Sequence, residues 1–129
     1  MIIDTNVLIF DTFIDSEKHE EAKELLDSLH EWYLPTIVLI EFIAFLNKSG
    51  IKREELLAKI EELIKNPKTI LIGIESEDVI KAIEMIRKEK LSTLRLNDKI
   101  ILNISKRLKK PLLTFDKDLE LQAKRNSNK

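Results

Sequence analysis

The fold is decided at residues 1–9, where the chain reads MIIDTNVLI. A short apolar run ends abruptly at Asp4 and an apolar helical pattern takes over, which predicts a strand followed directly by a helix. If residues 1–3 form a middle strand of a parallel sheet, Asp4 lies just beyond its carboxyl end, where α/β folds place their ligands. Asp is also a preferred N-cap residue, and Asp4 taken alone fits that structural role equally well.

Strand and helix patterns alternate along the rest of the chain. Apolar residues recur at three- and four-residue spacing in the helical segments, and segment 36–46 is apolar nearly all round, which predicts a buried helix. The strand at 69–74 is unbroken and β-branched, so we expect it to be covered on both faces. The predicted helices span 17–32, 36–46, 52–65, 76–86, 98–108 and 116–125, and the other predicted strands span 33–35 and 112–115.

This alternation, with short connections, predicts an α/β protein: a three-layer α/β/α sandwich with a central parallel sheet. A chain of 129 residues fits one domain. We expect that domain at residues 1–125 and a polar tail at 126–129. Only two glycines occur, which excludes the glycine-rich phosphate loops of nucleotide-binding folds.

Composition excludes several classes of function. The 22 basic and 23 acidic residues nearly cancel, which rules out a polycationic nucleic-acid coat but leaves room for a local basic groove. Cysteine is absent, so thiol nucleophiles, disulfide scaffolds and zinc ribbons are excluded. His19 and His30 lie in a charged segment at a spacing that suits neither a metal pair nor a catalytic triad. No apolar run is long enough to span a bilayer and no signal peptide precedes the first strand, so we expect a cytoplasmic protein.

Four carboxylates are placed where they could meet. Glu41 lies in the most apolar predicted helix, and an unpaired buried carboxylate there would cost several kcal/mol, so it needs a partner, a metal or a route to the surface. Asp98 begins a predicted helix, and Asp116 follows the last strand at the edge that carries Asp4, with Asp118 two residues later. Each of these aspartates alone is explained as a helix cap or a solvated acid.

Taken together, these acids predict a metal site. Asp4 and Asp116 follow strands, whereas Glu41 and Asp98 lie on helices that abut the same edge of the sheet. Such a cluster of negative charge is unstable without cations, and ligation by oxygen alone suits Mg²⁺ or Mn²⁺ rather than zinc. Divalent ions in an acidic pocket are the machinery for attack of water on a phosphodiester.

In this order and spacing, the motifs resemble the PIN-domain family, and within it the small VapC-like toxins of toxin–antitoxin pairs. The motifs that carry the resemblance are DTNVLI at 4–9, Glu41 within an apolar helix, Asn97-Asp98 opening a helix, and LTFDKD at 113–118. The resemblance implies a metal-dependent ribonuclease that uses Mg²⁺ or Mn²⁺ and whose acids match Asp4, Glu41, Asp98 and Asp116. It also implies auxiliary roles: Asp118 as an occasional further acid, a Thr114 hydroxyl beside the metal, and an Asn6 amide that orders the loop after the first strand.

The resemblance further implies an RNA substrate, an antitoxin protein that covers the acidic cleft, and a homodimer. The end of the Glu41 helix that carries Phe42, Phe45 and Leu46 could supply the dimer face or belong to the core. The chain departs from the family pattern in three places. Large residues occupy 99–103 where small ones are usual, Leu119 replaces a common aromatic, and the final strand expected after the last helix is not evident in 121–129.

Six basic residues are candidates for RNA contacts, because they cluster in the segment that carries two of the acids and phosphate binding needs positive charge near the metals. They are Lys99, Lys106, Arg107, Lys109, Lys110 and Lys117. The alternative is that most of them are solvated helix faces. Two other functions remain open, namely a PIN nuclease of RNA maturation and a non-catalytic α/β partner-binding module.

Overall fold

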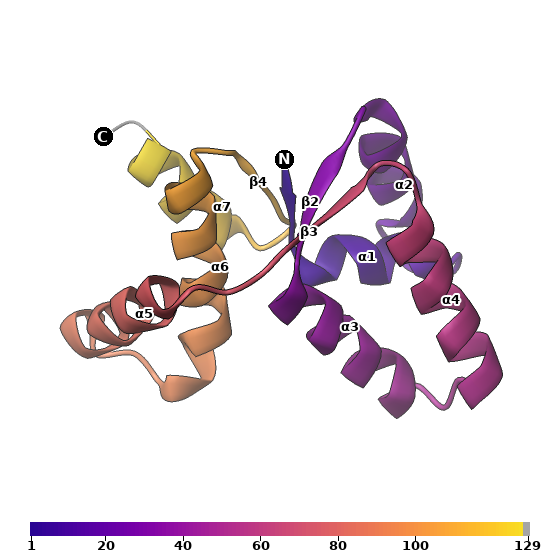
Figure 1. The fold of residues 1–129 in the computed structure, drawn as a ribbon, viewed down its shortest axis with the longest axis horizontal. Helices are drawn as coiled ribbons and strands as arrows, with labels where there is room; N and C mark the ends of the chain where they lie inside the picture. Colours follow the sequence, from indigo (N-terminus) through magenta and orange to yellow (C-terminus); the bar gives the residue numbers. More distant parts are fainter. Residues whose placement is uncertain (128–129) are drawn as a thin grey trace.

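A central four-stranded parallel sheet organises the molecule (Figure 1). The computed structural model describes residues 1–127. The strand order is β3-β2-β1-β4, so the first strand lies in the middle of the sheet as the sequence predicts. The strands are β1 (Ile2–Ile3), β2 (Trp32–Pro35), β3 (Thr69–Ile72) and β4 (Leu112–Leu113).

Two layers of helices enclose this sheet. In Figure 1, α1 to α4 lie on one side of the sheet and α5 to α7 on the other, which confirms the predicted three-layer α/β/α architecture. The helices are α1 (Thr5–Thr12), α2 (His19–Ser28), α3 (Thr36–Lys48), α4 (Arg53–Lys65), α5 (Ser76–Glu89), the short 3-10 helix η1 (Thr93–Arg95), α6 (Leu96–Leu108) and α7 (Lys117–Ser127). None of the helices in residues 1–127 combines the length and the apolar character needed to cross a membrane.

The core explains why α6 carries large apolar residues. Ile2 and Ile3 of β1 are fully buried because helices cover both of their faces. Helix α6 packs against α5 on one side and α7 on another, and it also touches α3. Every residue from Lys99 to Ser105 is consequently buried, and the branched side chains of Ile100–Leu102 fill the space between these layers.

Helix α3 is less buried than its composition predicts. Phe42 and Leu46 are completely buried, but Ile40 is 65% exposed and Phe45 is 39% exposed. Neighbouring elements cover only one side of this helix, so the remaining apolar side chains face solvent. Phe42 and Leu46 therefore belong to the core and cannot form a dimer face, whereas Phe45 lies at the surface.

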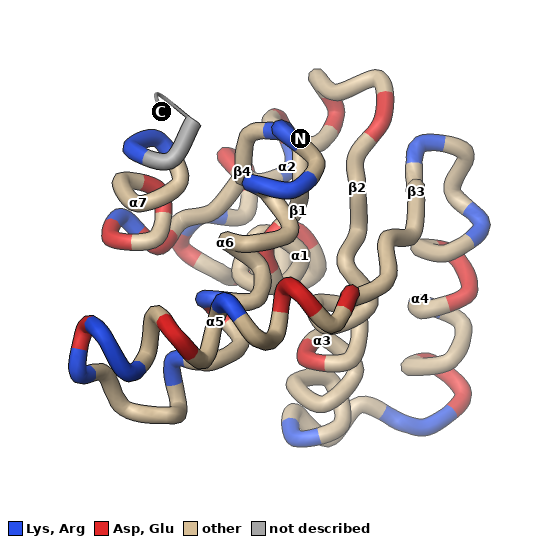
Figure 2. The backbone as a smooth tube through the Cα atoms, turned by 60° about the vertical axis from the view of Figure 1, so that its left-hand side comes forward, with Lys and Arg blue, Asp and Glu red and all other residues tan. Residues whose placement is uncertain are grey.

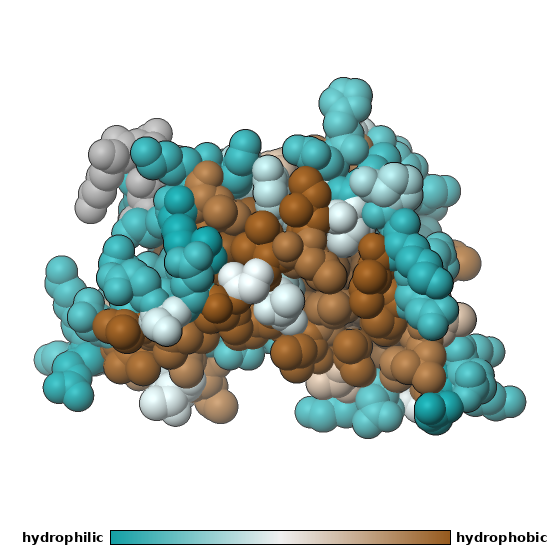
Figure 3. All heavy atoms as spheres, viewed as in Figure 1, coloured by the Kyte–Doolittle hydropathy of each residue, from teal (hydrophilic) through white to brown (hydrophobic). Residues whose placement is uncertain are grey.

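Strand β3 is also more open than predicted, because it is the edge of the sheet and pairs only with β2. Leu71 is 43% exposed and Ile74, just beyond the strand, is 38% exposed, so the expectation of cover on both faces is wrong. Figure 3 shows a broad band of apolar side chains on the face of the molecule that β3 crosses.

Several predicted boundaries shift. The helix predicted at 17–32 is observed only at His19–Ser28, and Trp32 instead begins β2, where its indole N–H donates to the Thr69 hydroxyl at 3.0 Å. The extended conformation lets Trp32 fill the core from the sheet rather than from a helix face. Helix α7 continues to Ser127, two residues beyond its predicted end, and positions 128–129 of the predicted tail lie outside the described residues. Within residues 1–127, no strand follows α7.

Candidate active site

The four acids lie at the carboxyl edge of the sheet because all strands run in the same direction. Asp4 directly follows β1, and Asp116 lies three residues after β4. Helix α3 begins at once after β2 and carries Glu41 on its second turn, while Asp98 is in the first turn of α6. In a parallel α/β sheet this edge is where ligand sites form.

Asp4 is both a helix cap and a buried acid. Its Oδ1 accepts a hydrogen bond from the Thr5 amide at 2.8 Å, which caps α1, and its Oδ2 accepts one from the Thr114 hydroxyl at 2.7 Å. Only 6% of the residue is exposed. Burial is the main cause that raises the pKa of Asp4 from 3.8 to about 6; the hydrogen bonds from Thr114 and Thr5 oppose it, and Asp98 and Glu41 add to it.

Asn6 and Thr114 join the beginning of α1 to the loop after β4. The Asn6 amide nitrogen donates to Oδ2 of Asp4 at 3.4 Å and to the Thr114 hydroxyl oxygen at 3.2 Å. The Asn6 amide oxygen accepts from the Phe115 N–H at 3.1 Å, and the Thr114 hydroxyl oxygen accepts from the Asp116 N–H at 3.1 Å. The bonds from Asn6 to Thr114 and Phe115, and the bond from Thr114 to Asp4, span 108 to 110 positions of sequence and fix the two acid-bearing loops against each other.

Glu41 is held by two partners that the sequence analysis did not assign. It is only partly buried. Its Oε1 accepts a hydrogen bond from the Thr5 hydroxyl at 2.8 Å, and its Oε2 accepts one from the Asn97 side-chain amide at 3.3 Å. Thr5 and Asn97 each stand next to a candidate acid in the sequence, and that adjacency was the signal available for finding them. Glu41 is thus not an isolated buried carboxylate, and its partners aim it at the loops of Asp4 and Asp98.

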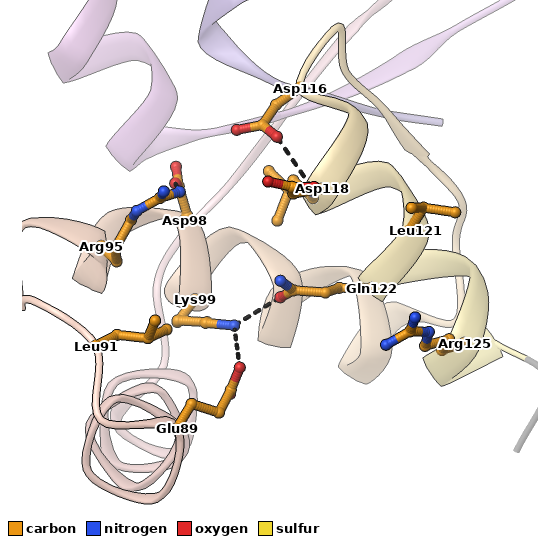
Figure 4. Close-up of a pocket in the computed structure, with 11 residues that line it drawn as sticks. Glu89, Leu91, Arg95, Asp98, Lys99, Asp116, Asp118, Leu121, Gln122 and Arg125 are labelled. Carbon is orange, nitrogen blue, oxygen red and sulfur yellow. Dashed lines mark hydrogen bonds and ion pairs between the residues drawn. The ribbon is translucent and has the colours of Figure 1, made fainter.

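Asp98 and Asp116 border a pocket of about 230 Å³ beside α6 and α7 (Figure 4). Burial is the first cause that raises the pKa of Asp98, and the charges of Asp116 and Glu41 add to it. The guanidinium of Arg95 lies 3.7 Å from Oδ2 of Asp98 and opposes that shift. Asp116 Oδ1 accepts from the Leu119 N–H at 3.1 Å, so Asp116 also caps α7, and the exposed Asp118 lines the same pocket.

The donor set has the chemistry of a site for a hard divalent cation. Asp4, Glu41 and Asp98 influence one another electrostatically, and Asp116 influences Asp98. An ion among these acids would be ligated by carboxylate oxygens, which Mg²⁺ and Mn²⁺ prefer. Within residues 1–127, no group of three acidic or histidine side chains is arranged to hold a single ion.

Two of the six basic candidates are structural. Lys99 is 2% exposed, and its ammonium donates to Glu89 at 3.0 Å and to Gln122 at 2.6 Å, which ties α6 to α5 and α7 (Figure 4). Arg107 makes a bidentate pair with the buried Asp78, at 3.0 and 3.1 Å. Lys99 is therefore inaccessible to a phosphate, and the Arg107 guanidinium is already bonded to another side chain of the protein.

Three others lie at the opposite edge of the sheet. Helix α6 runs from Asp98 at the carboxyl edge to the amino end of β4, and Lys106, Lys109 and Lys110 follow at its far end. Their proximity to the acids in sequence therefore does not become proximity in space. Of the six, only Lys117 is exposed beside the acids. Arg95 and Arg125 line the pocket of Figure 4, and the sequence analysis did not single them out.

Comparisons with known proteins agree with this architecture. The PIN domain family matches residues 1–125. Crystalline VapC20 of Mycobacterium tuberculosis, described as a sarcin-ricin loop cleaving toxin, superposes with a TM-score of 0.79 at 16% identity over 93% of this chain and 92% of that chain. A toxin-antitoxin complex from Klebsiella pneumoniae superposes with a TM-score of 0.62 at 22% identity, over 88% of this chain and 83% of that chain. FitAcB from Neisseria gonorrhoeae superposes with a TM-score of 0.69 at 17% identity, over 95% of this chain and 92% of that chain. A search of curated proteins found no match.

Proposed function

The chain belongs to the PIN-domain family, and on that premise we propose that it is an endoribonuclease that depends on Mg²⁺ or Mn²⁺ and acts as the toxin of a toxin–antitoxin pair. The observation that carries this proposal is the position of Asp4, Glu41, Asp98 and Asp116 at one edge of the sheet, and the raised pKa of Asp4 and of Asp98, caused by burial and by neighbouring acids, agrees with it. An arrangement that disfavours its own charges is expected of a site built to hold cations.

The chain's own residues would position the acids. Thr114 and Asn6 hold one oxygen of Asp4, while Thr5 and Asn97 orient the two oxygens of Glu41. A divalent ion bound to Asp4, Glu41, Asp98 and Asp116 would supply activation of water and neutralisation of charge on the phosphodiester. Asp118, at the border of the same pocket, would be an auxiliary acid.

We propose that the RNA backbone lies along the acidic edge, where Lys117 and Arg95 offer positive charge. Electrostatic contacts of this kind hold a phosphate chain without reading its sequence. Lys99 and Arg107 are left out of this surface because their charged groups are bonded within the fold.

The assignment to a toxin rests on relatives in fold. VapC20 is described as a toxin, and the Klebsiella pneumoniae structure is a toxin-antitoxin complex. We propose an antitoxin protein that covers the acidic edge, and a homodimer to which the exposed Ile40 and Phe45 of α3 contribute apolar surface. Arrest of growth on expression, relieved by a co-expressed neighbouring gene, would distinguish a toxin from a nuclease of RNA maturation.

The activity is tested by incubating the purified protein with unstructured and structured RNA in Mn²⁺, Mg²⁺ or EDTA. We expect cleavage of the unstructured RNA with either metal and none in EDTA. Asp4→Asn should abolish cleavage because an amide lacks the anionic ligand, whereas Asp15→Asn, at an exposed position outside the site, should cleave normally. Cleavage in EDTA would contradict metal dependence, and folded protein that binds RNA without cutting it would favour a non-catalytic module.

A further inference from the structure

A second hollow lies beside β4, an outer strand of the sheet. It has a volume of about 750 Å³ and is formed by β4, the end of α6 and one side of α7. Its apolar lining includes Pro111, Leu112 and Ala123. Thr114, whose hydroxyl holds Asp4 in the nuclease site, also lines this groove; the function proposed above uses none of the other residues described in its lining.

The groove runs along an edge of the sheet that no strand within residues 1–127 covers. The sheet ends at β4, because β4 pairs only with β1. The carbonyls of Pro111 and Leu113 accept from the N–H groups of Ile2 at 2.8 Å and Asp4 at 3.0 Å, so both carbonyls point toward β1.

Backbone groups alternate in direction along a strand, and the N–H and C=O of Leu112 therefore point away from β1, into the groove. No hydrogen bond described within residues 1–127 uses either group. Only 6% of Leu112 is exposed, but an edge strand that pairs on one side alone is a template for a further strand.

Positive charge surrounds this edge. Lys106, Lys109 and Lys110 are exposed and line the groove. Among the described residues, one acidic side chain lines it, Glu120, and this is paired with Lys124 at 2.9 Å. In Figure 2, basic segments gather beside β4 and the N-terminus.

The turn that carries these lysines is fixed. The Lys110 N–H donates to the Ser105 carbonyl at 3.2 Å, and the Ser105 hydroxyl donates to the Lys110 carbonyl at 2.6 Å. The backbone of Lys109 and Lys110 is thus held in a defined position relative to β4.

We propose that this groove binds an extended, acidic segment of a partner protein, which adds to the sheet as a strand beside β4. The Leu112 backbone would pair with that strand, its apolar side chains would lie on Pro111 and Ala123, and its carboxylates would meet the lysines. RNA fits these features less well. Single-stranded RNA is held by stacking on aromatic rings, and none of the described residues that line the groove is aromatic.

The test uses an acetylated and amidated nine-residue peptide that alternates Glu with Val, at low salt, with binding followed by fluorescence anisotropy. A peptide that alternates Lys with Val and a nine-nucleotide uridine RNA serve as controls. We expect the acidic peptide to bind and both controls to bind at least tenfold more weakly. Lys109→Glu with Lys110→Glu should weaken the acidic peptide at least tenfold, whereas Lys48→Glu with Lys52→Glu, exposed between α3 and α4, should not.

Amide exchange of Leu112 decides whether the peptide adds as a strand. A saturating concentration of the acidic peptide should slow that exchange at least tenfold, because the N–H then gains a partner. Equal binding of the basic peptide, tighter binding of the uridine RNA at the same lysines, or unchanged Leu112 exchange in the saturated complex would each overturn the proposal. None of these readouts depends on RNA cleavage, so failure here and failure of the nuclease proposal are separate results.

Discussion

Titration of Asp4 should make the metal-free protein lose stability as pH rises. The folded-state pKa of about 6 stands above the ordinary value of 3.8, so the folded protein binds this proton more tightly than the unfolded chain does. The resulting stability is fully present below the unfolded pKa and is lost as pH rises through the folded pKa. The difference corresponds to about 3 kcal/mol in all, of which about 2 kcal/mol falls between pH 4.5 and 7.

Asp4→Asn removes this titration and isolates its contribution. The amide cannot accept on both sides as the carboxylate does, because its NH₂ must face either the Thr5 N–H or the donors Thr114 and Asn6. We expect that mismatch to cost about 1 kcal/mol at every pH. The change with pH, rather than the absolute stability, is therefore the diagnostic quantity.

The measurement is urea unfolding in EDTA at a series of pH values, followed by fluorescence of Trp32, the only tryptophan, which is buried. Burial also raises the pKa of Asp11, and that contribution persists in both proteins, so the wild type and Asp4→Asn are compared by subtraction. The wild type should lose about 2 kcal/mol more than Asp4→Asn between pH 4.5 and 7. The reasoning is refuted if the two proteins lose the same amount, or if Asp15→Asn reproduces the Asp4→Asn result.

Three further outcomes are expected. Asp98→Asn should stabilise the metal-free protein at pH 7, because it relieves repulsion from neighbouring acids. Mn²⁺ at a hundred times its dissociation constant should add about 2.7 kcal/mol to the stability of the wild type and so raise its melting temperature. The melting temperature of the variant should rise much less. An unchanged wild-type melting curve would mean that the acids hold no ion. Arg107→Ala should cost about 3 kcal/mol in denaturant unfolding, because it removes the charged partner of the buried Asp78 and leaves that carboxylate with the Glu75 N–H at 2.9 Å. A loss below about 0.5 kcal/mol would contradict a stabilising role for this pair. Phe42→Ala should cost about 3–5 kcal/mol, whereas Phe45→Ala should cost about 1 kcal/mol or less; equal losses would contradict the one-sided burial of α3.

Local pattern was sufficient to predict the architecture and the edge at which the acids gather. Hydrophobic period separates strands from helices, and parallel strands place the residues that follow them at a common edge. Asp4 and Asp116 were therefore predictable at a common edge of the sheet, although 112 positions separate them in the sequence. The partners of Glu41 required the folded structure, because Thr5 and Asn97 reach it from two different helices.

Residue type and periodicity alone gave wrong predictions of which apolar side chains are buried and which basic side chains lie near the acids. Strand β3 and helix α3 have the composition of buried elements, but burial depends on which neighbours cover each face, and both elements have one side without cover. Lys99 and Lys109 lie in the same helical segment, yet one is enclosed between α5 and α7 and the other stands at the opposite end of the sheet from the acids.

The sequence by itself determined the order of strands and helices, the family and the types of ligand atoms available, because these depend on chemistry and spacing along the chain. The tertiary structure alone decided which acids are buried, which lysines are exposed at the surface, and which edge strand pairs on one side only. Those properties depend on distance and solvent access, and both are set by contacts between segments far apart in the chain.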